Sequence, residues 1–292
     1  MKPVPFDYSR PSSIEEACAL LAADAEACVI AGGQSLVPML AMRLARPTRL
    51  VDIARLPELA GVREDGDVVV VGAATRQAAA ERHPLVAAKV PLLAKVFPWI
   101  GHPAPRRHGT IGGSIAHADP SAEIPLVVAT LGAEIVVRHE SRASTIDAAA
   151  FFLGAMVTAL PQGGLITAIR LPVWRAARLG VGFHEVNGRH SDFAFVCAAA
   201  QVALDAAGRC TACALGVGGL SDHPRRIDAV SDALIGTALD DATVADAVAA
   251  ALAPIEASYD LHTSADYRKR SAGVLARRAL IDARQAALGN PR

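Results

Sequence analysis

Short apolar runs alternate with amphipathic stretches along the first half of the chain. Three of the runs, residues 27–30, 49–53 and 67–72, have the length of buried strands and lie next to charged or turn-forming residues. Residues 12–22 instead place apolar side chains at helical spacing, with Ser12 or Ser13 positioned to cap the first turn. The pattern predicts a domain that mixes helices and strands without an internal repeat.

The same pattern continues to about residue 171. It predicts helices over 75–82, 85–97 (interrupted at Pro91) and 122–131, and strands over 133–138 and 165–171. Residues 101–105 contain two prolines within three positions, so this segment is expected to be irregular.

The composition changes around residues 172–180, and we place a domain boundary between residues 174 and 175. Beyond it, the pattern predicts strands over 181–186 and 209–217 and three helices over about 225–236, 241–253 and 264–287. Residues 194–206 fit either element, because their alanines favour a helix whereas their valines and phenylalanines favour a strand.

Composition and charge narrow the class of protein. Apolar residues make up 52% of the chain, which is enough for a large core, and 29 basic residues balance 29 acidic ones. A net charge of zero argues against a nucleic-acid-binding protein. The sequence contains no uninterrupted apolar run of membrane-spanning length, and residues 1–8 lack the apolar run of a signal peptide. Five sparse cysteines fit a reducing compartment, so we expect a cytoplasmic protein.

Two glycine pairs carry the most specific chemistry in the sequence. Gly32 and Gly33 lie between an apolar strand and a predicted helix, and Gly112 and Gly113 precede a dense group of polar residues at 114–123. Glycine allows a backbone to approach a ligand closely, and successive N–H groups in such a loop bind anions. Neither pair belongs to a Rossmann or P-loop motif. Together they suggest a diphosphate that is held from two sides.

With their flanking residues, these pairs resemble a known family. Residues 31–35 (Ala-Gly-Gly-Gln-Ser), 110–114 (Thr-Ile-Gly-Gly-Ser) and 117–123 are similar to the FAD-binding (medium) subunit of molybdenum hydroxylases. This family includes carbon monoxide dehydrogenase medium chains and the flavin domain of xanthine dehydrogenase. The segments 183–194 and 267–280 extend the resemblance over nearly the whole chain. The resemblance also favours a strand over 194–206.

The resemblance implies an α+β protein with two domains. Residues 1–174 would form the two-lobed FAD-binding domain of the vanillyl-alcohol-oxidase (PCMH) type, and residues 175–292 a smaller α+β domain with a short sheet and C-terminal helices. FAD would be bound non-covalently. Molybdopterin and [2Fe-2S] clusters are expected only in partner subunits, a large and a small one. Electrons would pass from the iron–sulfur subunit through FAD to an external acceptor.

The resemblance also implies where FAD binds. The diphosphate would lie on backbone N–H groups of 32–36, 113 and 114, so that a side chain at Gly33 or Gly113 would exclude it. The second domain would cover the flavin through residues 183–185. No catalytic or metal-binding residue is expected in this chain. The implied cofactor-binding residues are Ile30, Ala31, Gly32, Gly33, Gln34, Ser35, Leu36, Ile100, Gly109, Thr110, Gly113, Ser114, His117, Glu123, Ile169 and Glu185.

The remaining polar features of the sequence are less specific than the two glycine pairs. Asp119 and Glu123 have the spacing of one helical face, and they favour either a helix N-terminus or, for Glu123, a hydrogen bond to the flavin. Cys210 and Cys213 are interpreted as structural residues that point to opposite faces of a strand. The basic residues of the last helix are expected to be solvated or to contact a partner. The alternative function is a stand-alone FAD-dependent oxidase or reductase.

Overall fold

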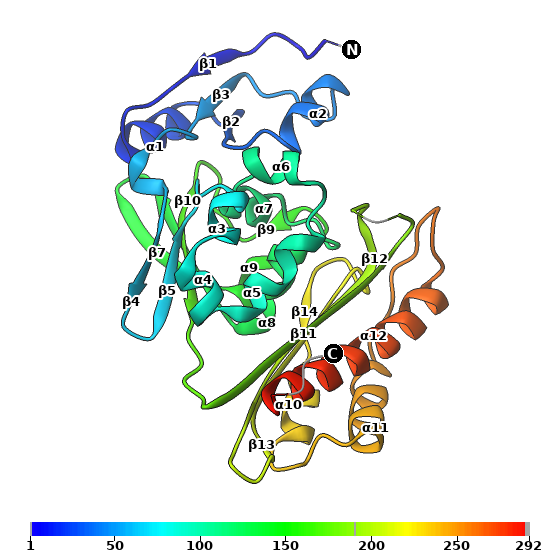
Figure 1. Ribbon diagram of the computed structural model, residues 1–292. Helices are drawn as coiled ribbons and strands as arrows, with labels where there is room; N and C mark the ends of the chain where they lie inside the picture. The colour runs from blue at the N-terminus through cyan, green and yellow to red at the C-terminus, as the bar shows by residue number, and fades with distance from the viewer. Residues whose placement is uncertain (1, 190, 290–292) are drawn as a thin grey trace.

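A small parallel sheet forms the first lobe of the molecule. The computed structural model describes residues 2–189 and 191–289, and Figure 1 shows this lobe in blue at one end. Its three strands lie in the order β1-β3-β2. Ser13 caps α1 by accepting a hydrogen bond from the Glu16 N–H, as one of the two expected caps. The elements of this lobe are β1 (Asp7–Ser9), α1 (Ile14–Ala23), β2 (Ala27–Ile30), α2 (Leu36–Ala41) and β3 (Arg49–Asp52).

A five-stranded antiparallel sheet forms the second lobe, with strand order β4-β5-β10-β6-β7. Its strands are β4 (Val62–Asp65), β5 (Val68–Gly72), β6 (Glu134–His139), β7 (Arg142–Asp147) and β10 (Leu165–Pro172). The helices beside it are α3 (Gln77–Glu81), α4 (Pro84–Lys89), α5 (Pro91–Val96), α6 (Pro103–His108), α7 (Ile111–His117), α8 (Glu123–Leu131) and α9 (Ala148–Phe151). Short 3₁₀ turns at Pro57–Leu59 and Phe97–Trp99 and a hairpin of β8 (Phe152–Gly154) and β9 (Val157–Thr158) complete the lobe.

Prolines explain two differences from the expected elements. Pro91 does not merely interrupt a helix: α4 ends at Lys89 and α5 begins anew with Pro91 in its first turn. The expectation that residues 101–105 are irregular holds for Gly101 and His102 but was wrong for residues 103–105, because α6 begins at Pro103. A proline is tolerated in a first turn because its missing N–H would have no intrahelical acceptor there.

A four-stranded antiparallel sheet with three helices forms the C-terminal domain. The strands lie in the order β11-β12-β13-β14, and in Figure 1 α12 lies across this sheet. Residues 194–204 form a strand, as the resemblance implied. The elements are β11 (Arg178–Asn187), β12 (Ala194–Leu204), β13 (Cys210–Gly218), β14 (Arg225–Arg226), α10 (Asp228–Leu234), α11 (Asp241–Leu252) and α12 (Ala265–Ala287).

Strand β12 is buried on both of its faces. Val196, Ala198 and Ala200 pack in the core beneath α12, whereas Cys197 and Ala199 belong to the core of the second lobe. A strand that is covered on both faces has a nearly continuous apolar sequence rather than an alternating one. This is why the residues alone did not distinguish strand from helix at 194–206.

Two cysteines and one basic residue of the C-terminal domain are buried, whereas Arg270, Arg277 and Arg278 of the last helix are exposed as expected. Cys210 and Cys213 both lie in the core beneath α12, so the expectation of opposite faces was wrong. A bulge in the pairing of β12 with β13 leaves Thr211 without a partner position and returns both side chains to one face. Arg268 is buried as well. Its guanidinium donates hydrogen bonds to the Phe195 and Gly219 carbonyls and pairs with Asp260.

Helix α12 lies directly on the backbone of β11 through two glycines. A Cβ at Gly180 would lie 1.9 Å from the Ala283 carbonyl oxygen, and one at Gly182 would lie 2.0 Å from that of Ala279. Both distances are far below van der Waals contact.

Among the described residues, none of the helices has the length and apolar character that a membrane span requires.

We expect Gly182→Ala to destabilise the protein by about 1–3 kcal/mol, because the added methyl group must push α12 away from β11. The matched control is Gly273→Ala in α12 itself, where a Cβ would meet nothing within 4 Å. That change should stabilise the helix by about 0.5–1 kcal/mol. Urea unfolding of both variants measures the two effects, and equal stabilities would contradict the packing argument.

Candidate functional site

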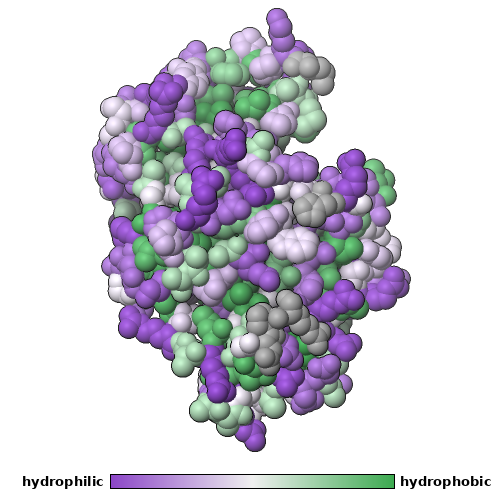
Figure 2. All heavy atoms as spheres, in the orientation of Figure 1, coloured by the Kyte–Doolittle hydropathy of each residue, from purple (hydrophilic) through white to green (hydrophobic). Residues whose placement is uncertain are grey.

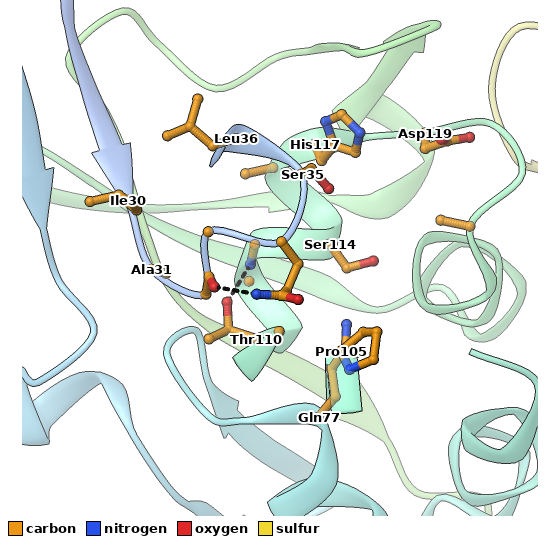
Figure 3. Close-up of a pocket in the computed structure, with 18 of the residues that line it drawn as sticks. Ile30, Ala31, Ser35, Leu36, Gln77, Pro105, Thr110, Ser114, His117 and Asp119 are labelled. Carbon is orange, nitrogen blue, oxygen red and sulfur yellow. Dashed lines mark hydrogen bonds between the residues drawn. The ribbon is translucent and has the colours of Figure 1, made fainter. Parts of the chain in front are cut away.

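The loop between β2 and α2 presents a row of unused backbone donors. Within the described residues, no hydrogen bond is formed by the N–H groups of residues 32–36. The loop is held through its carbonyl groups instead. The Val37 N–H donates to the Gly33 oxygen (3.0 Å), and the Gln34 side chain donates to the Gly32 oxygen (3.1 Å; Figure 3). Five consecutive N–H groups without an acceptor form a site for an anion.

The second glycine pair lies inside a helix rather than in a loop. Thr110 is the N-cap of α7, and its hydroxyl accepts a hydrogen bond from the Gly113 N–H (3.1 Å; Figure 3). The Gly112 N–H donates to the Ala73 oxygen, and the Ser114 N–H donates to the Thr110 oxygen. The expected second set of free donors at 113 and 114 is therefore already used within the protein. The hydroxyl groups of Thr110 and Ser114 remain as donors on this side.

Glycines bring the two sides together. A Cβ at Gly32 would lie 2.4 Å from the His108 oxygen, and one at Gly112 would lie 2.5 Å from the Ala73 Cβ. Gly33 has a φ of +70°, a conformation that L side chains rarely adopt. A Cβ at Gly113 would meet the Thr110 hydroxyl at 2.7 Å. Substitution of Gly33 would therefore strain the backbone, and substitution of Gly113 would disturb the cap, in addition to any effect on a bound diphosphate.

A cavity of about 660 Å³ lies between these two sides. Figure 2 shows a hollow in the molecular surface near α2 and the tip of the β11–β12 hairpin, and residues from both regions line the cavity. The expected binding residues that line it are Ile30, Ala31, Gly32, Gly33, Gln34, Ser35, Leu36, Ile100, Gly109, Thr110, Gly113, Ser114, His117 and Glu123.

Two of the expected residues do not line the cavity. Ile169 is buried in the core of the second lobe, and Glu185 is absent from the cavity wall. The covering segment is also different from the expected one. Phe183 packs against Trp99 inside the molecule, with ring centroids 5.6 Å apart, and residues 191–193 of the C-terminal domain line the cavity instead.

Sequence reasoning missed several other residues of the wall. Gln77 is a buried polar residue, and its side chain would be 2.9 Å from a Cβ at Gly109. Residues 191–193 belong to a segment that supported the family resemblance, so a signal for them existed. Cys28, Leu160 and residues 164–166 of the wall carried no such signal. The polar residues of the wall that were not among the expected cofactor-binding residues are Cys28, Gln77, His102, Asp119, Ser121, Ser191 and Asp192.

Arg106 fixes the segment that carries Ile100. Its buried guanidinium donates to the Ile100 and Gly101 carbonyl oxygens at 3.0 and 2.9 Å and forms an ion pair with Glu81. Charge-assisted hydrogen bonds to two successive carbonyls hold a turn firmly. Arg106 therefore positions one side of the cavity without lining it.

The charges on the wall are all acidic. Among the described residues, no lysine or arginine lines the cavity, whereas Asp119, Glu123 and Asp192 do. Glu123 is the first residue of α8 and is 8% exposed, and burial raises its pKa to about 7. Asp119 lies in the turn before α8 and not on a shared helical face, as Ala118 ends α7 in a left-handed conformation. No group of three or more described metal-ligating side chains could hold a metal ion.

Comparisons with known proteins match nearly the whole chain. Residues 4–174 match the FAD binding domain in molybdopterin dehydrogenase, and residues 182–283 match the CO dehydrogenase flavoprotein C-terminal domain. The chain is 37% identical to the carbon monoxide dehydrogenase medium chain of Afipia carboxidovorans, over 96% of this chain and 97% of that protein. It is 36% identical to the 6-hydroxypseudooxynicotine dehydrogenase complex subunit alpha of Paenarthrobacter nicotinovorans, over 97% and 96%.

The fold matches solved structures of the same kind. A chain of quinoline 2-oxidoreductase from Pseudomonas putida 86 superposes with a TM-score of 0.93 at 35% identity, over 99% of this chain and 100% of that one. The residues present fit FAD by their own chemistry. The unpaired N–H groups of residues 32–36 suit a diphosphate, and the contact with the His108 carbonyl leaves no room for a side chain at Gly32.

We expect Gly32→Ala to weaken FAD binding by about tenfold or more, since overpacking typically costs about 1–3 kcal/mol and the loop must move off the His108 carbonyl. The change in affinity is measured by titrating FAD fluorescence with the FAD-free variant. Circular dichroism shows whether the variant is folded. Gly273→Ala, with its open surroundings, should keep the wild-type affinity. A wild-type affinity in Gly32→Ala would contradict the role of this contact.

Proposed function

This chain belongs to the family of FAD-binding medium subunits of molybdenum hydroxylases, and from that membership we propose that it transfers electrons through FAD to an external acceptor. The electrons come singly from a small iron–sulfur subunit, after a large molybdopterin subunit has hydroxylated the substrate. FAD supplies the change from single electrons to pairs. The chain itself binds the cofactor and sets its surroundings.

The row of unpaired N–H groups at residues 32–36 is the observation that carries this proposal. It forms one side of a cavity that both domains line, and the hydroxyl groups of Thr110 and Ser114 lie on the other side. Neutral donors hold the diphosphate here, as no basic side chain of the described residues lines the cavity. Residues 191–193 limit access to the bound flavin from the C-terminal domain.

We place the division between the two domains at residues 174 and 175, in the connection from β10 to β11. The ranges matched by the two family models, which end at 174 and begin at 182, support this division. We also propose that the protein works in the cytoplasm. All five cysteines are free thiols, which is typical of a reducing compartment.

We expect the FAD to be bound non-covalently. Cys28 is the cysteine of the cavity wall, and burial raises the pKa of its thiol, which makes it a poor nucleophile at neutral pH. Acid precipitation of the purified protein should leave the yellow flavin in the supernatant. Flavin that stays with the washed precipitate would contradict this, and digestion of the precipitate would then identify the attached residue.

The main test uses the subunit alone and with its partners. The isolated protein with FAD should not be reduced by any organic substrate of the complex, because its proposed electron source is another subunit. Addition of the iron–sulfur and molybdopterin subunits should restore reduction at the same substrate concentration. Anaerobic bleaching of the visible flavin band measures both. Rapid bleaching of the isolated subunit would instead support a stand-alone oxidase or reductase.

A further inference from the structure

Two carboxyl groups, those of Glu123 and Glu185, lie where α8 meets the sheet of the C-terminal domain. Glu123 lines the cavity and is 8% exposed, and Glu185 lies on β11 just outside the wall. Glu185 Oε1 accepts a hydrogen bond from the Asn187 side chain at 2.8 Å. Its Oε2 is buried and has no hydrogen-bond partner among the described residues. An unpaired buried carboxylate oxygen is costly, so this oxygen favours a proton.

The strand pairing directs Glu185 toward the start of α8. Glu185 and Cys197 occupy opposite positions on the antiparallel strands β11 and β12, so their side chains lie on the same face of the sheet. The Cys197 thiol lies 4.0 Å from the carbonyl oxygen of Ser121, two residues before Glu123. Glu185 therefore faces the segment that begins with Glu123. The sheet and the helix bring the two carboxyls together although 62 positions separate them in the sequence.

Among the described residues, the charged groups that shift the pKa of either glutamate are acids. Burial raises the pKa of Glu123 to about 7, and the charge of Asp119 adds to the effect. Burial and then the charge of Glu123 raise the pKa of Glu185 to about 8, against the hydrogen bond from Asn187. The Cys197 thiol between them is fully buried, and burial raises its pKa too. Neither glutamate forms an ion pair within the described residues.

Electrons that enter the cavity therefore add negative charge to a place where no lysine or arginine can compensate it. The added charge acts most strongly on groups that already titrate near neutral pH. Besides Glu123, the titratable side chains that line the cavity are Cys28, His102, His117, Asp119 and Asp192. Glu185 differs from all of them because it is not part of the cavity wall.

We propose that Glu123 and Glu185 act as one acid that takes up a proton from water when the bound flavin is reduced and releases it when the flavin is reoxidised. This inference rests on the proposed function, which supplies the electrons from the iron–sulfur subunit. At a pH where both glutamates are ionised in the oxidised protein, reduction of the flavin consumes two electrons and one proton. One further proton forms an O–H bond on the pair, and reoxidation by the acceptor returns both protons to water.

The test is the pH dependence of the flavin's midpoint potential in the wild type and in Glu185→Gln. The amide keeps the length of the side chain and an oxygen that accepts from Asn187, but it does not titrate. Just above pH 8, the wild-type potential should fall with pH more steeply than one proton per two electrons requires. The part of the slope beyond one proton per two electrons should shrink in Glu185→Gln. It should disappear when Glu123→Gln is added.

One control variant separates the pair from carboxylates elsewhere. Glu58→Gln removes one carboxylate at an exposed position and should leave the slope unchanged. A wild-type slope of one proton per two electrons, or an unchanged excess slope in Glu185→Gln, would overturn the inference. In either case FAD would still bind and accept electrons, so the proposed function would stand.

Unfolding of the FAD-free protein provides a readout that does not depend on the cofactor. Both folded-state pKa values are raised above their ordinary value of 4.5, so the folded protein binds more protons than the unfolded chain between these values. The pair's contribution to stability is therefore full below about pH 4.5 and is lost as pH rises through 7 and 8. Glu185→Gln should flatten this decline, and Glu58→Gln should not. Equal declines in all three proteins would overturn the inference.

Discussion

The free N–H groups of residues 32–36 set the requirement that the rest of the N-terminal domain meets. A loop whose donors are unpaired within the protein is not held by them, so other contacts must fix its position. The Val37 N–H and the Gln34 side chain do so through carbonyl groups, and Gly32 lies against the His108 carbonyl. Arg106 in turn fixes the adjoining turn at Ile100. The loop can therefore present its donors to an anion without reorganising.

Close approach through glycine recurs where the molecule joins its parts. Gly32 joins the two lobes, Gly112 seats α7 beside Ala73, and Gly180 and Gly182 seat α12 on β11. The last contact determines the direction of β11, which buries Phe183 against Trp99 and aims Glu185 at α8. Packing in the C-terminal domain thus reaches the cavity, although only residues 191–193 of that domain line it among the described residues.

Much of the fold could be predicted from the sequence, because periodicity and caps are local properties. The helix at 14–23 and the strands at 27–30 and 49–52 lie where the pattern placed them. The sequence could not show that the second glycine pair lies within a helix, because Thr110 caps it through a hydroxyl whose geometry is not encoded in spacing. The bulge at Thr211, the buried Arg268 and the covering segment at 191–193 depend on contacts between distant strands. Such contacts leave no periodic signal in one sequence.

The cavity combines two features that are hard to reconcile unless protons move. In the proposed placement, neutral N–H dipoles hold an anionic cofactor, and the charged residues that line the wall among those described are acids. Dipoles fixed in a loop cannot strengthen when more negative charge arrives, and no basic side chain of the wall can turn toward it. A pair of buried carboxyls that titrate near neutral pH can respond, since a proton taken from water cancels the added charge. The absence of lysine and arginine from the described wall and the presence of Glu123 on it, with Glu185 outside it, are then two parts of one electrostatic arrangement.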